Sequence, residues 1–146
     1  PYQFVRKGKE MRFLQQQWSN NEFIGLGTSS CSFVAGWDYN NALPLQRYFQ
    51  KLNENGIAVD SGKKLCKEES MRRFMALGLK MSGLNKRNSG VCKRLFRKKF
   101  AVDLDEEFGE TIKRLEGLGL IEEKKGFVSL SYNGLFFHDE VGRAFF

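Results

Sequence analysis

The chain has 146 residues, of which 41% are hydrophobic and 28% charged, and its formal net charge is +7 at pH 7. This length suits one domain, or a small domain with an extra segment packed on it. No apolar run approaches the roughly 20 residues of a membrane-spanning helix, so no membrane association is expected.

Residues 1–42 are predicted to form strands and turns. Apolar and polar residues alternate over 2–5, and a glycine-punctuated loop follows the Phe23-Ile24 pair. The Asn40-Asn41 pair then predicts a turn, because asparagine is frequent in turns.

Two amphipathic helices are predicted next. Pro44 suits a first helical residue, and a helical stripe follows it until Gly56: Leu45, Tyr48, Phe49 and Leu52. The second helix should run from about Lys67 to Met81, with Glu68 and Glu69 at its positive N-terminal end. Its expected core face consists of Met71, Phe74, Met75 and Gly78.

The third and fourth helices differ in charge. The third, over 91–100, is predicted to turn Val91, Leu95 and Phe96 inward and its basic residues outward. The fourth should begin at Asp103, which stands three residues before Glu106, as in an Asp variant of the capping box. Its apolar stripe is Leu104, Phe108, Ile112 and Leu115.

The end of the chain predicts a hairpin and a closing helix. Leu120-Ile121 and 127–130 flank a turn at 124–126, and a helix should run from about Asn133 to Phe145. Two helices followed by a hairpin give the order of a winged-helix-like module. We therefore divide the chain into 1–60 and 61–146.

Charge is distributed unevenly along the chain. Residues 62–100 carry thirteen Lys and Arg against two Asp and Glu, whereas residues 103–123 carry eight Asp and Glu against two Lys and Arg. A basic block of this kind can follow the phosphates of a nucleic acid. It also fits a solvated helix face that meets the acidic helix, or an acidic patch of a longer parent chain, and this second interpretation is favoured.

The cysteines favour a reducing compartment. Cys31, Cys66 and Cys92 stand far apart without a CxxC pair, which predicts free side chains in a cytoplasmic protein rather than a disulfide framework. The single histidine, His138, has no neighbour at ligand spacing, so no metal site is predicted. Because Pro1 takes the place of an initiator Met and opens in mid-pattern, we expect a cut end and no signal peptide.

An ordered series of segments resembles one enzyme family. Residues 18–32, WSNNEFIGLGTSSCS, resemble the Trp, Gly-x-Gly and Ser segment of oxygen-independent coproporphyrinogen III oxidases and their relatives, which include haem chaperones and haem-degrading radical-SAM enzymes. Glu68-Glu69 with 75–81 resembles the family's "EE…MLGLRL" helix. Residues 115–121, 128–134 and 139–141 resemble its "GLL…LT-x-x-G…V" ending. The series covers nearly the whole chain in the right order.

The resemblance implies a fold and a parent enzyme. Family members have a partial barrel whose CxxxCxxC loop holds a [4Fe–4S] cluster, and S-adenosylmethionine on that cluster yields the radical that oxidises a porphyrinogen propionate. The expected fold class here is α+β: a short β-rich segment from the edge of the barrel, then a helical, winged-helix-like C-terminal domain that caps it. The chain alone is expected to hold no cofactor and to be inactive. Its expected partners are the N-terminal radical-SAM barrel of its own parent and a porphyrin-type substrate.

The glycine-rich loop is the candidate cofactor site. Gly25 and Gly27 let the backbone approach a ligand or take positive φ, and Thr28 and Ser29 offer hydroxyls. These residues alone also fit a bend without a ligand. The resemblance implies a loop at the mouth of the active site, where Cys31 replaces an aliphatic residue or His and would line the pocket.

Arg12 and Gln16 are the candidate substrate contacts. Arg12 matches the Arg of the family's "R-H-N" signature, whereas Phe13 and Leu14 depart from its His and Asn. These departures leave a porphyrin-related but different substrate open. A surface strand would carry the same polar residues. No catalytic residue and no metal ligand are predicted within the chain.

Two other classes of function compete with an enzyme part. One is a winged-helix nucleic-acid-binding module, in which the basic third helix and the hairpin would touch phosphates. The helix before the hairpin would then face DNA with acidic residues, so nucleic-acid binding is not expected. The other is a protein-interaction domain, suggested by the fourteen Phe residues.

Overall fold

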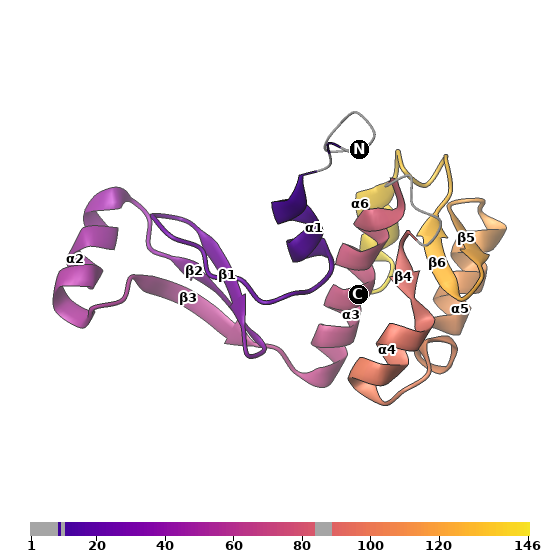
Figure 1. The fold of residues 1–146 in the computed structure, drawn as a ribbon, viewed down its shortest axis with the longest axis horizontal. Helices are drawn as coiled ribbons and strands as arrows, with labels where there is room; N and C mark the ends of the chain where they lie inside the picture. Colours follow the sequence, from indigo (N-terminus) through magenta and orange to yellow (C-terminus); the bar gives the residue numbers. More distant parts are fainter. Residues whose placement is uncertain (1–8, 10, 84–88) are drawn as a thin grey trace. The chain divides into compact units, whose positions relative to one another are not determined.

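The computed structural model describes residues 9, 11–83 and 89–146 (Figure 1). They fall into two compact units. One, which we call the hairpin unit, comprises Asn21–Ser70; the other, the helical unit, comprises Met71–Phe146 with the described residues up to Asn20. The division into 1–60 and 61–146 stays a prediction, and the predicted alternation at the start of the chain lies outside the described residues. No helix in the described part of the chain is long and apolar enough to span a membrane.

The helical unit begins with a helix where a strand was predicted. α1 (Arg12–Trp18) contains Arg, Leu and three Gln, all of which favour helices. Leu14 and Trp18, four residues apart and thus on one face, are half-buried. The strand prediction for this segment is wrong, because helix propensity outweighed a polar run with too few apolar residues to reveal a period.

The next elements follow the predicted order. α3 (Lys67–Leu79) starts in the hairpin unit and continues into the 3₁₀ helix η1 (Lys80–Gly83). A short strand, β4 (Val91–Cys92), precedes α4 (Lys93–Phe100) and α5 (Leu104–Gly117). The predicted third helix thus starts at Lys93, since the two residues before it pair with a strand.

The predicted hairpin consists of β5 (Ile121–Lys124) and β6 (Phe127–Leu130). Lys125 and Gly126 connect them with φ angles of 52° and 77°, the left-handed pair of a type I′ turn. β4 pairs with the other edge of β6, which gives an antiparallel sheet of order β4-β6-β5. Helices followed by this small sheet match the predicted winged-helix-like arrangement (Figure 1).

Apolar burial holds the helical unit together. Phe96 is fully buried, and its ring centroid lies 4.9 Å from that of Phe100 and 6.0 Å from that of Phe108. The predicted stripe of α5 is buried in the same cluster: Leu104, Phe108, Ile112 and Leu115. Leu95, which was predicted to point inward, is 51% exposed. Phe96 and Phe100 define the core face of α4, and Leu95 lies about 100° around the helix from it.

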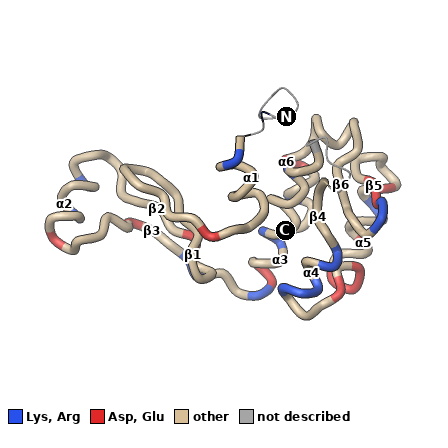
Figure 2. Tube along the Cα trace, in the orientation of Figure 1, with Lys and Arg blue, Asp and Glu red and all other residues tan. Residues whose placement is uncertain are grey.

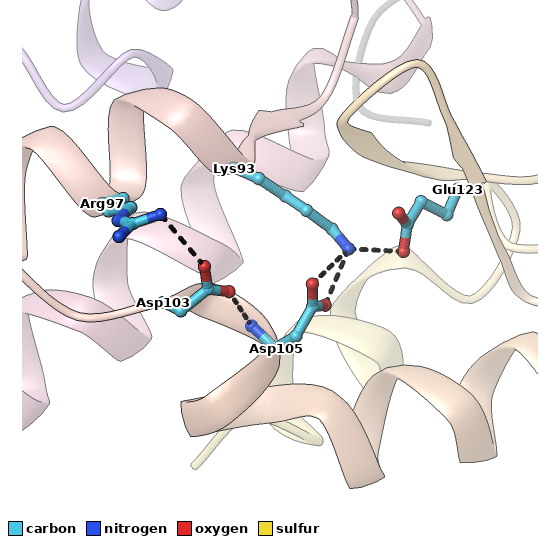
Figure 3. A network of polar contacts seen from close by, with 5 residues as sticks. All are labelled: Lys93, Arg97, Asp103, Asp105 and Glu123. Carbon is cyan, nitrogen blue, oxygen red and sulfur yellow. Dashed lines mark hydrogen bonds and ion pairs between the residues drawn. The ribbon is translucent and has the colours of Figure 1, made fainter.

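Charged contacts join α4 to α5 and β5 (Figure 3). Lys93 Nζ lies 2.7 Å from both carboxylate oxygens of Asp105 and 2.6 Å from Glu123 Oε2. Burial lowers the pKa of Lys93, but these hydrogen bonds raise the pKa above its ordinary value. Asp103 caps α5 by accepting a hydrogen bond of 3.0 Å from the Asp105 N–H, and its other oxygen lies 3.9 Å from Arg97. The basic helix therefore meets the acidic one, as the favoured interpretation expected.

The closing helix is shorter than predicted. α6 spans His138–Arg143, and a hydrogen-bonded turn takes the place of its expected first residues. In that turn, the Ser131 hydroxyl donates to the Gly119 carbonyl and accepts from the Gly134 N–H. A Cβ at Gly134 would lie 1.8 Å from the Leu120 carbonyl oxygen. The backbone can therefore lie this close to Leu120 only because residue 134 is glycine.

The hairpin unit is a three-stranded antiparallel sheet with one helix. β1 (Cys31–Val34) and β2 (Trp37–Asn41) form a hairpin around Ala35 and Gly36, whose φ angles are 49° and 78°. β3 (Val59–Lys64), which was not predicted, pairs with β2, and the order is β1-β2-β3. The turn predicted at Asn40-Asn41 is instead the end of β2, with a register shift between these two residues.

α2 (Leu45–Asn55) follows the predicted boundaries closely and ends at Gly56, whose φ is 72°. Pro44 is its N-cap residue, one position before the first helical residue that we predicted it to be. No residue of α2 is buried in the described structure. Two residues of its apolar stripe lie open, since Leu45 is 49% and Phe49 54% exposed, whereas Tyr48 and Leu52 are half-buried.

Candidate functional site

The glycine-rich loop, residues 25–30, lies between a β-bridge at Phe23 and β1. Phe23 and Phe33 exchange two backbone hydrogen bonds of 2.9 Å, which fix the chain on the way into the loop. At its far end, the Asn41 N–H donates to the Ser30 carbonyl at 2.9 Å. Both ends of the loop are therefore tied to the sheet of the hairpin unit.

The two candidate glycines have different physical roles. A Cβ on Gly25 would lie 2.2 Å from the Cys31 carbonyl oxygen, so Gly25 permits a close approach to the protein's own strand. Gly27 has a φ of 96°, and a Cβ there would meet nothing within 4 Å. Glycine is thus favoured at position 27 because of its positive φ, and not because a side chain would clash there.

One side chain, Asn41, contacts the loop at three points. Its Nδ2 group donates to the Gly25 carbonyl at 3.2 Å, to the Gly27 carbonyl at 3.0 Å and to Ser30 Oγ at 3.0 Å. Two of these partners are carbonyl oxygens, which can only accept, so the amino end of the Asn41 amide must face them. Asn41 is half-buried at the end of β2.

The hydroxyls of the loop face mostly inward. Thr28 Oγ1 donates to the Ala42 carbonyl at 2.7 Å, and Ser30 Oγ donates to the Gly27 carbonyl at 2.7 Å. The fully buried Ser32 accepts a hydrogen bond of 2.9 Å from the Gly25 N–H. The Thr28 hydroxyl, predicted as a cofactor contact, is therefore used to anchor the loop.

Several groups of the loop remain available to a ligand. Within the described residues, the backbone N–H groups of Leu26, Gly27 and Thr28 make no hydrogen bond. The Ser29 side chain is exposed, and Ser29 itself has a φ of 59° with its N–H bound to the Ala42 carbonyl at 3.2 Å. The loop therefore has three backbone N–H donors that could bind oxygen atoms of a ligand.

The remaining candidates lie on other elements. Cys31 is exposed at the start of β1, directly after the loop. Arg12 and Gln16 are exposed on α1, four residues apart and thus on one helix face. They belong to the helical unit, whereas Gly25, Gly27, Thr28, Ser29 and Cys31 come together in the hairpin unit.

The residues of this chain do not fit an iron–sulfur cluster. Such a cluster needs several thiolates close together. Cys31 lies in β1, Cys66 between β3 and α3, and Cys92 in β4. Within the described residues, no three His, Cys, Asp or Glu side chains gather as a metal site would require.

The structure also bears on the nucleic-acid interpretation. Figure 2 marks basic residues along α4, but Lys93 is paired with two carboxylates and Arg97 lies near Asp103. The first turn of α5, the helix before the hairpin, carries Asp105, Glu106 and Glu107. A winged helix would present these carboxylates to DNA phosphates, which repel them.

Sequence reasoning missed Asn41 and Ser32 as residues of this site. Both act on loop atoms that are distant along the chain, so no local motif marks them. The register of the β1–β2 hairpin, in which Cys31 opposes Asn40, brings Asn41 beside the loop. The two-residue turn at Ala35-Gly36 sets this register, but its first residue is alanine, which does not mark such a turn in a sequence.

A family model now adds to this geometry. The model of the HemN C-terminal domain matches residues 65–137, half of the chain. The chain belongs to this family. The match takes in α3, α4, α5 and the β5–β6 hairpin, and it leaves out the glycine-rich loop.

Relatives extend the similarity to the loop and to α1. The heme chaperone HemW of Bacillus subtilis (strain 168) is 28% identical over 142 residues, which are 97% of this chain and 36% of that protein. The heme chaperone HemW of Lactococcus lactis subsp. lactis (strain IL1403) is 26% identical over 132 residues, 90% of this chain and 32% of that protein.

A solved structure shows the same fold. Coproporphyrinogen III oxidase (HemN) from Escherichia coli, described as a radical SAM enzyme, superposes with a TM-score of 0.69 at 19% identity. The match covers 97% of this chain and 35% of that one. The chain thus spans about a third of the length of the HemW and HemN proteins that it matches.

Proposed function

We propose that the chain is the C-terminal part of a radical-SAM protein that acts on porphyrins or haem and resembles oxygen-independent coproporphyrinogen III oxidase. The observation that supports this best is the extent of the similarity to HemW and HemN, which reaches 97% of the chain. In this proposal its partner is the N-terminal barrel of the same parent, which it caps. A cytoplasmic location belongs to the proposal, because three free cysteines suit a reducing compartment.

The parent, in this proposal, holds the [4Fe–4S] cluster through residues outside this chain, and S-adenosylmethionine binds to that cluster within reach of the glycine-rich loop. When bound there, they supply the radical that removes hydrogen from the substrate. The role of this chain, in the proposal, is to bind and orient the cofactor and the substrate. The free N–H groups of Leu26, Gly27 and Thr28 can donate to carboxylate or hydroxyl oxygens of the cofactor. The exposed Ser29 hydroxyl and Cys31 thiol lie on the same loop and strand.

Arg12 is proposed to bind the substrate. Porphyrins carry propionate groups, and an exposed guanidinium can pair with a carboxylate through two parallel hydrogen bonds. Gln16, one helical turn further along α1, would add a polar contact on the same face.

A haem chaperone is the second candidate function. The observation in its favour is that two relatives, at 28% and 26% identity, are named heme chaperones. Under this alternative the same loop would line a site that holds a finished macrocycle rather than one that oxidises a porphyrinogen.

The parent protein, reconstituted anaerobically, separates the two functions. For an oxidase, cleavage of S-adenosylmethionine should depend on added coproporphyrinogen III and yield 5′-deoxyadenosine together with decarboxylated product. For a chaperone, the same preparation should bind haem stoichiometrically, seen as a shifted Soret band, and leave coproporphyrinogen III unchanged. A parent that neither cleaves S-adenosylmethionine nor binds haem would overturn both.

A further inference from the structure

We infer that Asn41 is the positioning residue of the glycine-rich loop: its amide holds the loop in the one conformation that can receive the ligand. The inference rests on the proposed function for the ligand and on the hydrogen bonds for the positioning. It assigns to Asn41 control over the site without contact with the ligand.

The contacts of Asn41 divide between its backbone and its side chain. The backbone N–H donates to the Ser30 carbonyl at 2.9 Å as part of the link between loop and sheet. The side chain reaches further, to the Gly25 and Gly27 carbonyls and the Ser30 hydroxyl. A substitution of Asn41 therefore removes the hydrogen bonds from its side chain to the loop and leaves the backbone hydrogen bond to Ser30 in place.

The loop has few other restraints between its ends. Thr28 Oγ1 and the Ser29 N–H both bind the Ala42 carbonyl, the residue directly after Asn41. The loop is thus hydrogen-bonded to the chain at the end of β2, through Asn41 and Ala42. Without the Asn41 amide, the Gly25 and Gly27 carbonyls lose a shared donor, and two glycines place little restriction on the backbone. The released loop would sample many conformations, and the ligand would have to select one of them.

The substitution Asn41→Asp tests this with almost no change of shape. A carboxylate has no hydrogen to donate, and it would face two carbonyl oxygens that repel it. The matched control is Asn40→Asp, which makes the same chemical change one residue earlier. Asn40 is exposed, and within the described part of the chain its side chain makes no hydrogen bond.

The first experiment uses the 146-residue chain and nuclear magnetic resonance. The side-chain NH₂ signals of Asn41 should exchange slowly with solvent, and Asn41→Asp should shift and broaden the amide signals of Gly25 and Gly27. The amide of Phe33, held by the bridge to Phe23, should keep its position as a measure of the intact sheet. Asn40→Asp should leave the two glycine signals unchanged. Fast exchange of the Asn41 amide, or unmoved glycine signals in Asn41→Asp, would overturn the inference whatever the parent does.

The pH dependence of the glycine signals in Asn41→Asp provides a second test. A residue that only fills space would not give such a dependence. Protonation restores one donor to the substituted carboxyl, and its pKa should lie above the usual value of about 4 because two carbonyl oxygens oppose the charge. The glycine signals of Asn41→Asp should therefore return toward the wild-type positions as the pH falls through this range. Signals that stay displaced at low pH would contradict the role of the donated hydrogen bond.

The ligand half of the inference is tested in the reconstituted parent by equilibrium binding of S-adenosylmethionine. Asn41→Asp should weaken binding about tenfold or more, the loss expected from about 1.4 kcal/mol of lost preorganisation. Asn40→Asp should bind within about twofold of the wild type. Equal binding by the wild type and Asn41→Asp would overturn the inference alone. A wild-type parent that binds no S-adenosylmethionine would overturn the proposed function. The spectra of the 146-residue chain would still test the role of Asn41, so the two failures can be distinguished.

Discussion

The helical unit and the hairpin unit are stabilised by different interactions. In the helical unit, buried apolar side chains from Met71 to Phe145 form one cluster, in which the ring of Phe96 packs against three other Phe rings. In the hairpin unit, the described residues bury just four side chains: Ser32, Phe33, Ala42 and Ala58. Its sheet and loop are held instead by backbone pairing and by hydrogen bonds that Asn41 and Thr28 donate and Ser32 accepts.

The two units should therefore be destabilised by different kinds of substitution. A packed apolar cluster loses stability when volume is removed from it. A unit held by hydrogen bonds and close backbone approach loses its conformation when an atom is added or a donor is removed. A glycine-rich loop on a thin sheet can therefore be released locally, which suits a segment that receives a ligand.

The largest expected loss is that of Phe96→Ala in the helical unit. Phe96 is fully buried among three other Phe rings, so its truncation should lower the free energy of unfolding by about 3–5 kcal/mol. The matched control is Leu95→Ala, because the neighbouring Leu95 is 51% exposed and should lose less than about 1 kcal/mol. Urea unfolding followed by circular dichroism measures both. Similar losses for the two variants would contradict the placement of the core face of α4.

Gly25→Ala should be the most damaging change in the hairpin unit. One added methyl group would lie 2.2 Å from the Cys31 carbonyl, so β1 or the loop must move, at a cost of about 1–3 kcal/mol. Gly109→Ala is the control with the opposite sign. Gly109 lies inside α5 with its nearest neighbour at 4.0 Å, and alanine there should add about 0.5–1 kcal/mol. Thermal melts of both variants decide the matter, and a silent Gly25→Ala would show that no close approach exists.

Lys93→Met removes the charged link between α4, α5 and β5, at an expected cost of about 1 kcal/mol. The folded-state pKa of Lys93 is raised, so its stabilising contribution is complete below the unfolded-state pKa of about 10.5. It is lost as the pH rises through the folded-state value. The stability difference between the wild type and the variant should thus be constant from pH 7 to 9 and shrink above about 10.5. A difference that persists undiminished at pH 11.5 would rule out the ionic link as its cause.

The sequence predicted the helical unit well because its signals are local. The stripe from Leu104 to Leu115 and the cap at Asp103 stand within a few turns of one helix, and both are confirmed. Phe96 was also placed correctly, whereas Leu95 was not, since the start of α4 depends on a pairing between Val91 and the distant Val128. Because Val91 lies in β4 and not in the helix, Phe96 and Phe100 define the core face of α4, and Leu95 lies outside that face.

The hairpin unit was harder to predict because its signals are not local. β3 has the sequence VDSGKK, without alternating apolar residues, and it is a strand because its backbone pairs with β2. The β1–β2 turn has Ala35 at a φ of 49°, where Asn, Asp or Gly is usual, so it carried no turn signature. The role of Asn41 follows from the register that this turn sets, which is why the loop glycines were predicted and the residue that holds them was not.

The smallest expected effect concerns the open stripe of α2. Phe49 is 54% exposed, and its ring meets that of Tyr48 edge to face at 5.9 Å. Phe49→Ser should therefore change the free energy of unfolding of the 146-residue chain by less than about 0.5 kcal/mol. In the longer parent that we propose, this stripe is a surface that further chain can cover, and the same change should then cost about 1.5–3 kcal/mol, the value of burying a Phe side chain.

Melting both forms of the protein, each with and without Phe49→Ser, makes this a double comparison. The matched control is Gln50→Ser, at the next and likewise exposed position of α2, which should be nearly silent in both forms. A large loss already in the 146-residue chain would mean that the hairpin unit has an apolar core of its own, and the contrast between the two units would fail. A negligible loss in both forms would instead show that the stripe stays uncovered in the parent, because removing an aromatic ring from water-exposed surface releases little stabilising burial.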